Sequence, residues 1–404
     1  QLSADLNYEN DYNMFYGFSD STLFAQQGLT RDSFLALDPS LGMMYNIVDF
    51  RLGAKSLHTD LNKFGYEATA GVGNLWGRYG MSELNYAADG TLHYGFPFLK
   101  QSKGIAYLHL DYDGWQSRQD TLDATARFLL QVNPYVDFMA RDLNFHVGAN
   151  LAFDHFSDTL TNFLIFPEVV VSTKFMNEAL SINLGFTGGL DANDWNTIRL
   201  VNPYVMPAAE ERATKHWDLY AHMRLTFSKK LELNARAQFS YLKDDLNFRL
   251  NLTDYPLGNG FCTDYVNYSR ATVGADLTFV NDEMLSATLG GHYYGYISEQ
   301  PLLYRPNWDA SLKVNVNYKD KLRLHLVTEL LGRMQSERQL EDGTEEMLPM
   351  RYGLGLELEY LHTRALSFFA KFDNILCQRY FYWTNYPSQR LQFMLGLTYT
   401  VPHK

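Results

Sequence analysis

The chain has 404 residues, of which 46% are hydrophobic, 15% aromatic and 20% charged, and its formal net charge is −12. This acidic balance argues against nucleic acid as a partner, because a phosphate-binding surface needs clustered Lys and Arg. No apolar run approaches the roughly 18 residues of a membrane helix. The two cysteines, Cys262 and Cys377, are too few for a disulfide framework.

Long alternating segments follow one another along most of the chain. Examples are residues 143–153, 180–186, 231–239, 271–279 and 352–360, in which every second residue is apolar. A β-strand places alternate side chains on opposite faces. These segments are longer than the usual strand of about 5 or 6 residues, and roughly 9 to 11 residues cross a bilayer as a tilted strand. The pattern predicts membrane-spanning strands.

The last alternating segment shows the two faces most clearly. Its polar or small positions include Gln392, Met394 and Thr398. We expect its apolar positions to face lipid: Leu391, Phe393, Leu395, Leu397 and Tyr399.

The connections between these segments alternate in length. One set is minimal, as at Asn177-Glu178 and at residues 319–321, whereas the other includes residues 191–215, 252–262 and 336–346. Short periplasmic turns and longer extracellular loops are typical of outer-membrane barrels. The sequence therefore predicts one all-β domain over residues 1–404, a transmembrane antiparallel up-and-down β-barrel. About 18 strands are expected, with 14 to 20 tolerable: thirteen from about Leu122 onward and five to seven before it.

Charged and polar residues fall on the expected inner face of four consecutive strands near the C-terminus. A charge on the lipid face costs about 2 to 4 kcal/mol at the midplane, which favours an inward orientation. The signs are mixed, which fits either a wide polar channel or an interior closed by ion pairs such as Lys371 with Glu357. The lumen-lining candidates are Lys313, Asn315, Arg323, His325, Glu329, Arg333, Glu357, Glu359, Lys371 and Asp373.

An unobstructed channel of about 18 strands would leak, since barrels of 16 to 18 strands leave an aqueous lumen. The Asp191 to Lys215 connection is the best internal candidate to narrow it. Its charged end contains Glu210, Glu211 and Arg212, which could pair with lumen charges.

Motifs that carry chemistry are scarce. No catalytic residues, cofactor or metal site can be nominated, so a non-enzymatic protein is expected. The carboxylates of "LDYDGW" (residues 110–115) and "DANDWN" (residues 191–196) make a Ca²⁺ site conceivable, but neither has the full loop spacing.

The segment from Phe369 to Val401 resembles the last two strands of TonB-dependent receptor barrels. It carries Asn374-Ile375-Leu376, the Tyr-rich run from Tyr380 to Trp383, a Tyr-Pro loop and a Gly-bearing final strand. Middle segments such as "LVNPYV" resemble barrels abundant in Bacteroidota outer membranes. Asn385 stands where the family has a loop Gly. The resemblance implies a receptor-like barrel, and we expect it to lack the plug domain. In such bacteria, Asp-Ser/Thr-apolar triplets are O-glycosylated, which makes Ser21, Thr121 and Thr159 candidate sites.

Two functions follow from these observations. The first is a transport-related pore or receptor-like barrel for hydrophilic solutes. The second is a non-transporting barrel subunit of a larger outer-membrane machine that assembles or exports surface proteins. The expected location is the bacterial outer membrane with both termini periplasmic. The expected partners are membrane lipid and lipopolysaccharide, and surface lipoproteins or other outer-membrane subunits in the second case.

Overall fold

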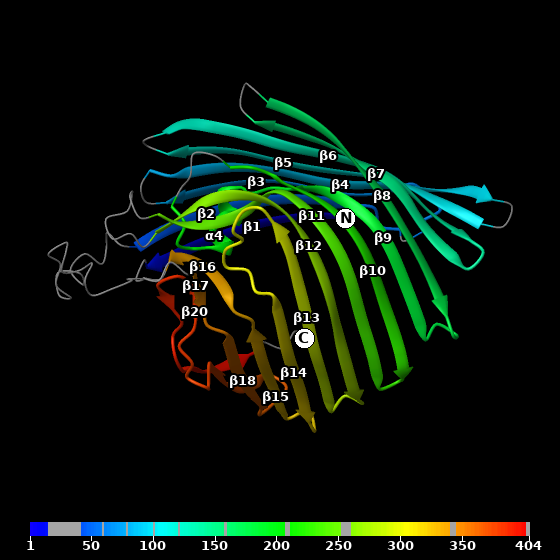
Figure 1. The fold of residues 1–404 in the computed structure, drawn as a ribbon. Helices are drawn as coiled ribbons and strands as arrows, with labels where there is room; N and C mark the ends of the chain where they lie inside the picture. The colour runs from blue at the N-terminus through cyan, green and yellow to red at the C-terminus, as the bar shows by residue number, and fades with distance from the viewer. Residues whose placement is uncertain are drawn as a thin grey trace. The chain divides into compact units, whose positions relative to one another are not determined.

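The structure is a computed structural model that describes residues 1–14, 42–58, 60–77, 80–99, 102–119, 122–156, 160–206, 211–251, 260–339 and 345–400 (Figure 1). Nearly all of these residues belong to β-strands, and the one helix among them is α4 (Trp195–Val201). No helix in this part of the chain is long and apolar enough to cross a membrane. The candidate glycosylation residues Ser21, Thr121 and Thr159 lie outside the described residues.

Eighteen strands form one large antiparallel sheet. Each strand pairs with its neighbour in the chain, as in an up-and-down arrangement, and the pairs with a defined register are all antiparallel. The strands are β1 (Leu2–Met14), β2 (Gly42–Lys55), β3 (Gly65–Gly77), β4 (Ser82–Leu99), β5 (Ser102–Gln119), β6 (Leu122–Ala140), β7 (Leu143–Phe156), β8 (Leu160–Phe175), β9 (Leu180–Asp191), β10 (Thr214–Ser228), β11 (Leu231–Asn251), β12 (Gly260–Asn281), β13 (Leu285–Ser298), β14 (Trp308–Tyr318), β15 (Leu322–Leu331), β18 (Arg351–Leu361), β19 (Leu366–Asp373) and β22 (Gln392–Tyr399).

The predicted fold class and strand number are confirmed. Thirteen strands of the sheet begin at or after Leu122 and five precede it, as the alternation indicated. The glycine-rich stretch from Gly71 to Gly77 continues β3 and is not a turn.

Two small hairpins stand apart from the sheet. They are β16 (Met334–Gln339) with β17 (Glu345–Leu348), and β20 (Phe381–Trp383) with β21 (Tyr386–Pro387). The resemblance places the Tyr-rich run within the last two strands of the barrel, but the structure places most of that run in the second hairpin, outside the large sheet. Strand β19 ends at Asp373, and the backbone then turns through positive φ angles at Asn374 and Cys377. The amide of Asn374 donates to two backbone carbonyls and fixes this turn.

Short turns join strands at one end of the sheet, and their backbone fits the strand twist. At Asn177-Glu178 and at Lys319-Asp320 both central residues have positive φ, the type I′ geometry preferred in tight hairpins. The amide of Lys321 donates to the carbonyl of Tyr318 across the second turn (3.1 Å). The expected difference in connection length is clear from β9 onward, whereas β3–β4 and β5–β6 are joined by short segments at the other end.

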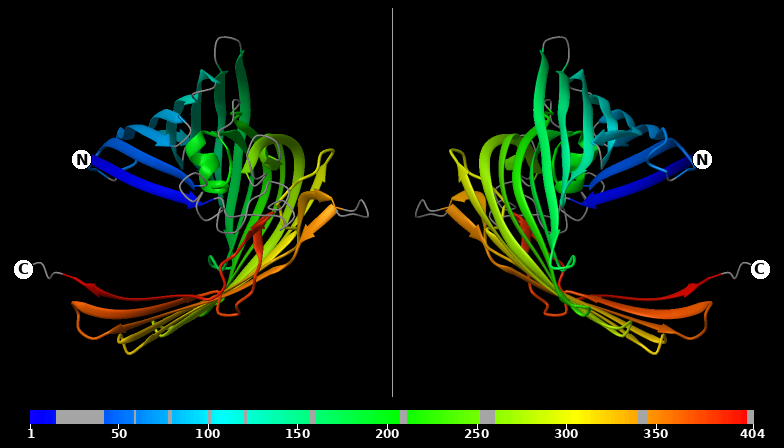
Figure 2. Two further views of the ribbon diagram at one scale, coloured as in Figure 1. Left: turned by 90° about the vertical axis from the view of Figure 1, so that its left-hand side faces the viewer. Right: turned by 90° about the vertical axis from the view of Figure 1, so that its right-hand side faces the viewer.

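Contacts group the chain into two compact units. Unit 1 consists of residues 1–173, 183–219 and 240–269, and unit 2 of residues 174–182, 220–239 and 270–404. Unit 1 has a buried apolar core. Its members from the strands are Trp115, Leu129, Ala152, Phe166 and Leu190, and Ala213 joins them from the connection before β10. Figure 2 shows α4, in green, beside the blue and cyan strands of this unit. The expectation of a single barrel domain stays a prediction.

Candidate functional site

The polar side chains of unit 2 form a continuous face across five strands. Asn315 of β14 lies opposite His325 of β15, and His325 lies opposite Glu357 of β18. Glu357 in turn lies opposite Lys371 of β19, which lies opposite Met394 of β22. Residues opposite each other in an antiparallel pair point to the same side of the sheet. The pairing therefore brings polar residues from distant parts of the sequence to one face.

The same register places most of the lumen candidates together. Nine share this face by strand alternation: Lys313, Asn315, Arg323, His325, Glu329, Glu357, Glu359, Lys371 and Asp373. Arg333 does not belong to it, because β15 ends at Leu331 and Arg333 lies exposed in the connection that follows. That this face lines a lumen stays a prediction.

The opposite face of β22 carries four of the five residues expected to meet lipid, and the fifth, Leu391, directly precedes the strand. Phe393, Leu395, Leu397 and Tyr399 lie opposite Phe372, Ala370, Phe368 and Leu366 of β19, so the apolar side chains of the two strands share one face. All of the expected lipid contacts are exposed, Leu395 to 70%. A large exposed apolar surface is costly in water and is expected where a protein meets lipid.

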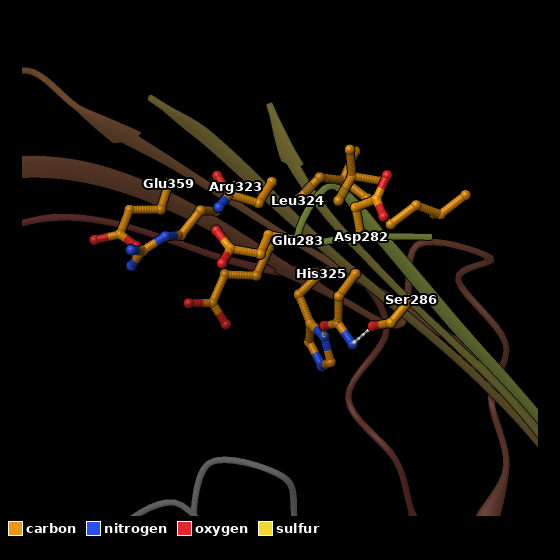
Figure 3. A pocket seen from close by; sticks show the side chains of 12 residues that line it. Asp282, Glu283, Ser286, Arg323, Leu324, His325 and Glu359 are labelled. Carbon is orange, nitrogen blue, oxygen red and sulfur yellow. Dashed lines mark hydrogen bonds and ion pairs between the residues drawn. The ribbon is translucent and has the colours of Figure 1, made fainter. Parts of the chain in front are cut away.

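A pocket of about 540 Å³ opens on the polar face of unit 2 (Figure 3). Its wall includes Arg323 and His325 together with the carboxylates Asp282, Glu283, Glu357 and Glu359. Two interactions shape it: the Arg323 guanidinium lies 3.4 Å from a Glu359 oxygen, and His325 Nδ1 lies 2.5 Å from Asn315 Oδ1. The amide of Asn315 donates to Ser286 (3.2 Å), the dashed line in Figure 3.

Ion pairs continue along the same face beyond the pocket. Lys371 lies opposite Glu357 in register, but it forms an ion pair with Asp373 on its own strand (3.8 Å). Glu329 pairs with Arg351 (3.2 Å), whose guanidinium also stacks on Tyr380 and Tyr382. These pairs are partly exposed and contribute little to stability. They set the charge pattern that a solute on this face would meet.

In unit 1 one face of the sheet carries Glu83, Ser117, Arg127 and Asp154, and it is called the polar face of unit 1. Part of the long connection after β9 covers this face. Residues 192–206 and 211–213, here called the capping segment, bury Trp195, Ile198 and Val205 almost completely. Burying a side chain of the size of Ile198 stabilises this arrangement by roughly 1.5–3 kcal/mol. The Asp194 carboxylate caps α4 by accepting from the amide of Thr197 (2.8 Å). The sequence predicted that this connection could fold inward, and its described residues do pack on the sheet.

Charged groups fasten the capping segment to the strands. Arg127 of β6 donates to the backbone carbonyl of Glu211 and forms a buried double hydrogen bond with Asp154 of β7 (2.8 and 2.6 Å). Arg199 of α4 pairs with Asp11 of β1 (3.2 Å). Arg212 of the capping segment and Lys215 of β10 both pair with Asp244 of β11, which is not one of the lumen candidates. Glu210 lies outside the described residues.

Glu211 differs from the sequence expectation, because it meets another carboxylate. Its side chain accepts from the indole of Trp115 and lies 3.0 Å from Ser117 Oγ. The same Ser117 oxygen lies 2.9 Å from Glu83 of β4, which is fully buried. Burial raises the pKa of Glu211 to about 8, and the nearby charge of Glu83 adds to this shift. Sequence reasoning missed this cluster because Glu83, Ser117 and Glu211 are far apart in the chain.

The carboxylates of the two sequence motifs also come together in unit 1. Asp113 and Asp194 line one small pocket with Asn85, whose amide donates to Asp194 (2.7 Å). Within the described residues, however, no group of three or more His, Cys, Asp or Glu side chains has the spacing to hold a metal ion.

Comparison with known proteins identifies the fold. No protein-family model and no curated protein sequence matches the chain. Among solved structures, the pyoverdine receptor FpvA of Pseudomonas aeruginosa matches with a TM-score of 0.70 and 11% identity, covering 99% of this chain and 68% of the receptor. The ferric enterobactin receptor PfeA of the same organism matches with a TM-score of 0.67 and 10% identity over 98% of this chain and 67% of the receptor.

The fold is that of a TonB-dependent receptor barrel. The copper transporter OprC also matches, with a TM-score of 0.61 and 10% identity over 89% of this chain and 66% of the transporter. The chain thus spans about two thirds of the length of the receptors it matches. At a sequence identity near 10%, these matches support a shared fold. The ligand and the mechanism have to be argued from the residues of this chain.

Proposed function

We propose that this chain is a non-enzymatic, receptor-like barrel of the bacterial outer membrane that gives hydrophilic solutes access to its polar face. The observation that carries the proposal is the division of the sheet into two faces across β14, β15, β18, β19 and β22. One face is apolar and exposed, and the other holds charged and polar side chains in register. The receptor and transporter folds that the chain matches support the same class.

The proposed orientation places the tight turns and both termini on the periplasmic side. Large aromatic side chains are exposed near the strand ends at these turns, at Phe227, Phe279, Tyr318 and Tyr360. Aromatic residues favour the two membrane interfaces, where one end of the ring is dry and the other is wet. Membrane lipid and lipopolysaccharide would then contact the apolar face.

The pocket on unit 2 suggests the kind of solute. Four carboxylates line it with one guanidinium and one imidazole, so both signs of charge are within reach of a bound molecule. A filter for one ion type would present a ring of one sign. The mixed lining suits polar solutes that themselves carry both donors and acceptors.

Conductance in planar bilayers tests this function. We expect the purified chain to conduct. The reversal potential in a salt gradient should show greater cation selectivity in Arg323→Gln and greater anion selectivity in Glu359→Gln than in wild type. Lys319→Gln is the matched control, because Lys319 lies in an exposed turn and is absent from the pocket wall. A chain that inserts but never conducts would contradict the transport function.

One observation favours the second candidate, a non-transporting subunit of an outer-membrane assembly. The capping segment is buried against the polar face of unit 1 by apolar contacts and by the Arg127 and Arg199 interactions. A barrel with a firmly packed interior segment suits an anchoring role. Purification in mild detergent from its native membrane distinguishes the two functions: the subunit role predicts stoichiometric lipoprotein or outer-membrane partners, and the solute-conducting role does not need them.

A further inference from the structure

Glu83 and Glu211 both contact the hydroxyl of Ser117, and the number of protons available there shows that one of the two carboxyl groups is protonated. Ser117 Oγ lies 2.9 Å from Glu83 Oε2 and 3.0 Å from Glu211 Oε1. A serine hydroxyl has one proton, so it can donate to one carboxylate only. The second contact is a hydrogen bond only if that carboxyl group is protonated and donates to the serine oxygen. With both carboxylates ionised, one would face a lone pair in a buried site.

The surrounding donors indicate which carboxyl group holds the proton. Glu83 accepts from the backbone amides of Trp195 (2.8 Å) and Asn196 (3.3 Å), at the start of α4, which favours its ionised form. Besides its contact with Ser117, Glu211 has one donor among the described residues, the Trp115 indole. The geometry is therefore a directed chain in which Glu211 donates to Ser117 and Ser117 donates to Glu83.

Among the described residues, the two buried guanidinium groups of this region, Arg127 and Arg199, are already paired with other carboxylates. From β6, Arg127 contacts only the backbone carbonyl of Glu211 and is matched by Asp154 of β7. From the capping segment, Asp194 adds negative charge near Glu211. Arg199 is matched by Asp11. Burial raises the pKa of Glu211 to about 8, in agreement with the count of donors.

We propose that the capping segment is a proton-dependent latch, held on the polar face of unit 1 while Glu211 is protonated and released when that proton is lost. The inference does not depend on solute transport, since a subunit of an assembly could use the same latch. Its physical basis is the cost of a second buried negative charge beside Glu83.

The direction of the pH effect follows from linkage. The docked segment binds a proton that the released segment, with an ordinary Glu pKa of about 4.5, does not hold at neutral pH. Docking is therefore strongest at acidic pH and weakens as pH rises toward about 8. For one proton, the ratio of docked to released molecules falls by up to about tenfold per pH unit across this window.

The experiment measures the position of the capping segment by pulsed electron resonance between two spin labels. The labels are attached in folded chains carrying Leu200→Cys and Asp142→Cys, with Cys262→Ala and Cys377→Ala. Leu200 is 67% exposed on α4, and Asp142 lies in the β6–β7 turn of the same unit. We expect one narrow distance at pH 5.5 and a second, broad population that grows as pH is raised to 9.

Three variants make the test specific. Glu211→Gln should keep the narrow distance at every pH, because the neutral amide donates to Ser117 without a titrating proton. Glu83→Gln should move the transition to lower pH, since the charge beside Glu211 is gone. Glu178→Gln, in an exposed turn, is the matched control and should titrate like the parent chain.

Folding of each variant is checked by its mobility on unheated gels. A wild-type distance distribution that is unchanged from pH 5.5 to 9 overturns the latch. Release by a chelator at constant pH, reversed by calcium, overturns it as well and replaces the proton with a metal ion.

Discussion

At the scale of single residues, Leu395 and Thr398 lie three positions apart on β22 and on opposite faces of the sheet. Leu395 is among the most exposed apolar side chains, whereas Thr398 lies opposite Ser367 on the polar face. If the apolar face meets lipid, Leu395→Arg puts a charge into hydrocarbon at a cost of about 2–4 kcal/mol near the midplane. Thr398→Arg puts the same charge into water.

We therefore expect Leu395→Arg to reduce folding into bilayers much more than Thr398→Arg. The measurement is the folded fraction after refolding into lipid vesicles over a urea series, with wild type alongside. Equal folded fractions for the two variants would contradict the assignment of the two faces.

Single residues also show what sequence alone could provide. The faces of β14, β15, β18, β19 and β22 were predictable, because alternation is a local pattern with a period of two. Arg333 was misplaced because the pattern does not reveal that β15 ends at Leu331. The Glu83, Ser117 and Glu211 cluster was out of reach, since its members meet only through pairing across the sheet and through the capping segment.

At the scale of elements, tight turns set the register of long hairpins. The β14–β15 turn places Lys319 and Asp320 at φ angles of 55° and 54°, a region that residues other than Gly, Asn and Asp rarely adopt. Tyr318 and Leu322 pair directly across it. The turn thus holds ten residue pairs in register at the expense of local strain.

Replacing Lys319-Asp320 with Asn-Gly should stabilise this hairpin, because Asn and Gly suit a type I′ turn. We expect a gain of about 1 kcal/mol in the free energy of unfolding, with the register unchanged. Urea unfolding in detergent micelles measures it. Asp320→Pro is the opposing control and should destabilise the chain, since proline fixes φ near −65°; a loss of stability in the Asn-Gly variant would refute the turn geometry.

Near the C-terminus, the local sequence pattern did not predict which segments join the large sheet. The Tyr-rich run from Tyr380 to Trp383 has the composition of a strand, and it does form β20. It leaves the large sheet because Asn374 and Cys377 adopt positive φ angles and because the Asn374 amide ties the turn to Gln378 and Gln389. The hydrogen bond to Gln389 joins two segments that are distant in the sequence, and the alternation of apolar and polar residues does not predict such contacts.

At the scale of the whole molecule, the function depends on what occupies the polar face of each unit. The capping segment covers part of the polar face of unit 1, with Trp195 and Ile198 fully buried. Replacing residues 194–212 with a flexible Gly-Ser linker of equal length removes these contacts and leaves the bounds of β9 and β10 unchanged.

We expect the linker variant to fold and to show a larger single-channel conductance than wild type, since the side chains that fill the polar side of unit 1 are gone. Planar-bilayer recording of both proteins at pH 6 measures the difference, and unheated gel mobility confirms folding. Equal conductance would mean that the segment does not narrow the path. If neither protein conducts, the interior is closed by other groups and the subunit role becomes the better account of the chain.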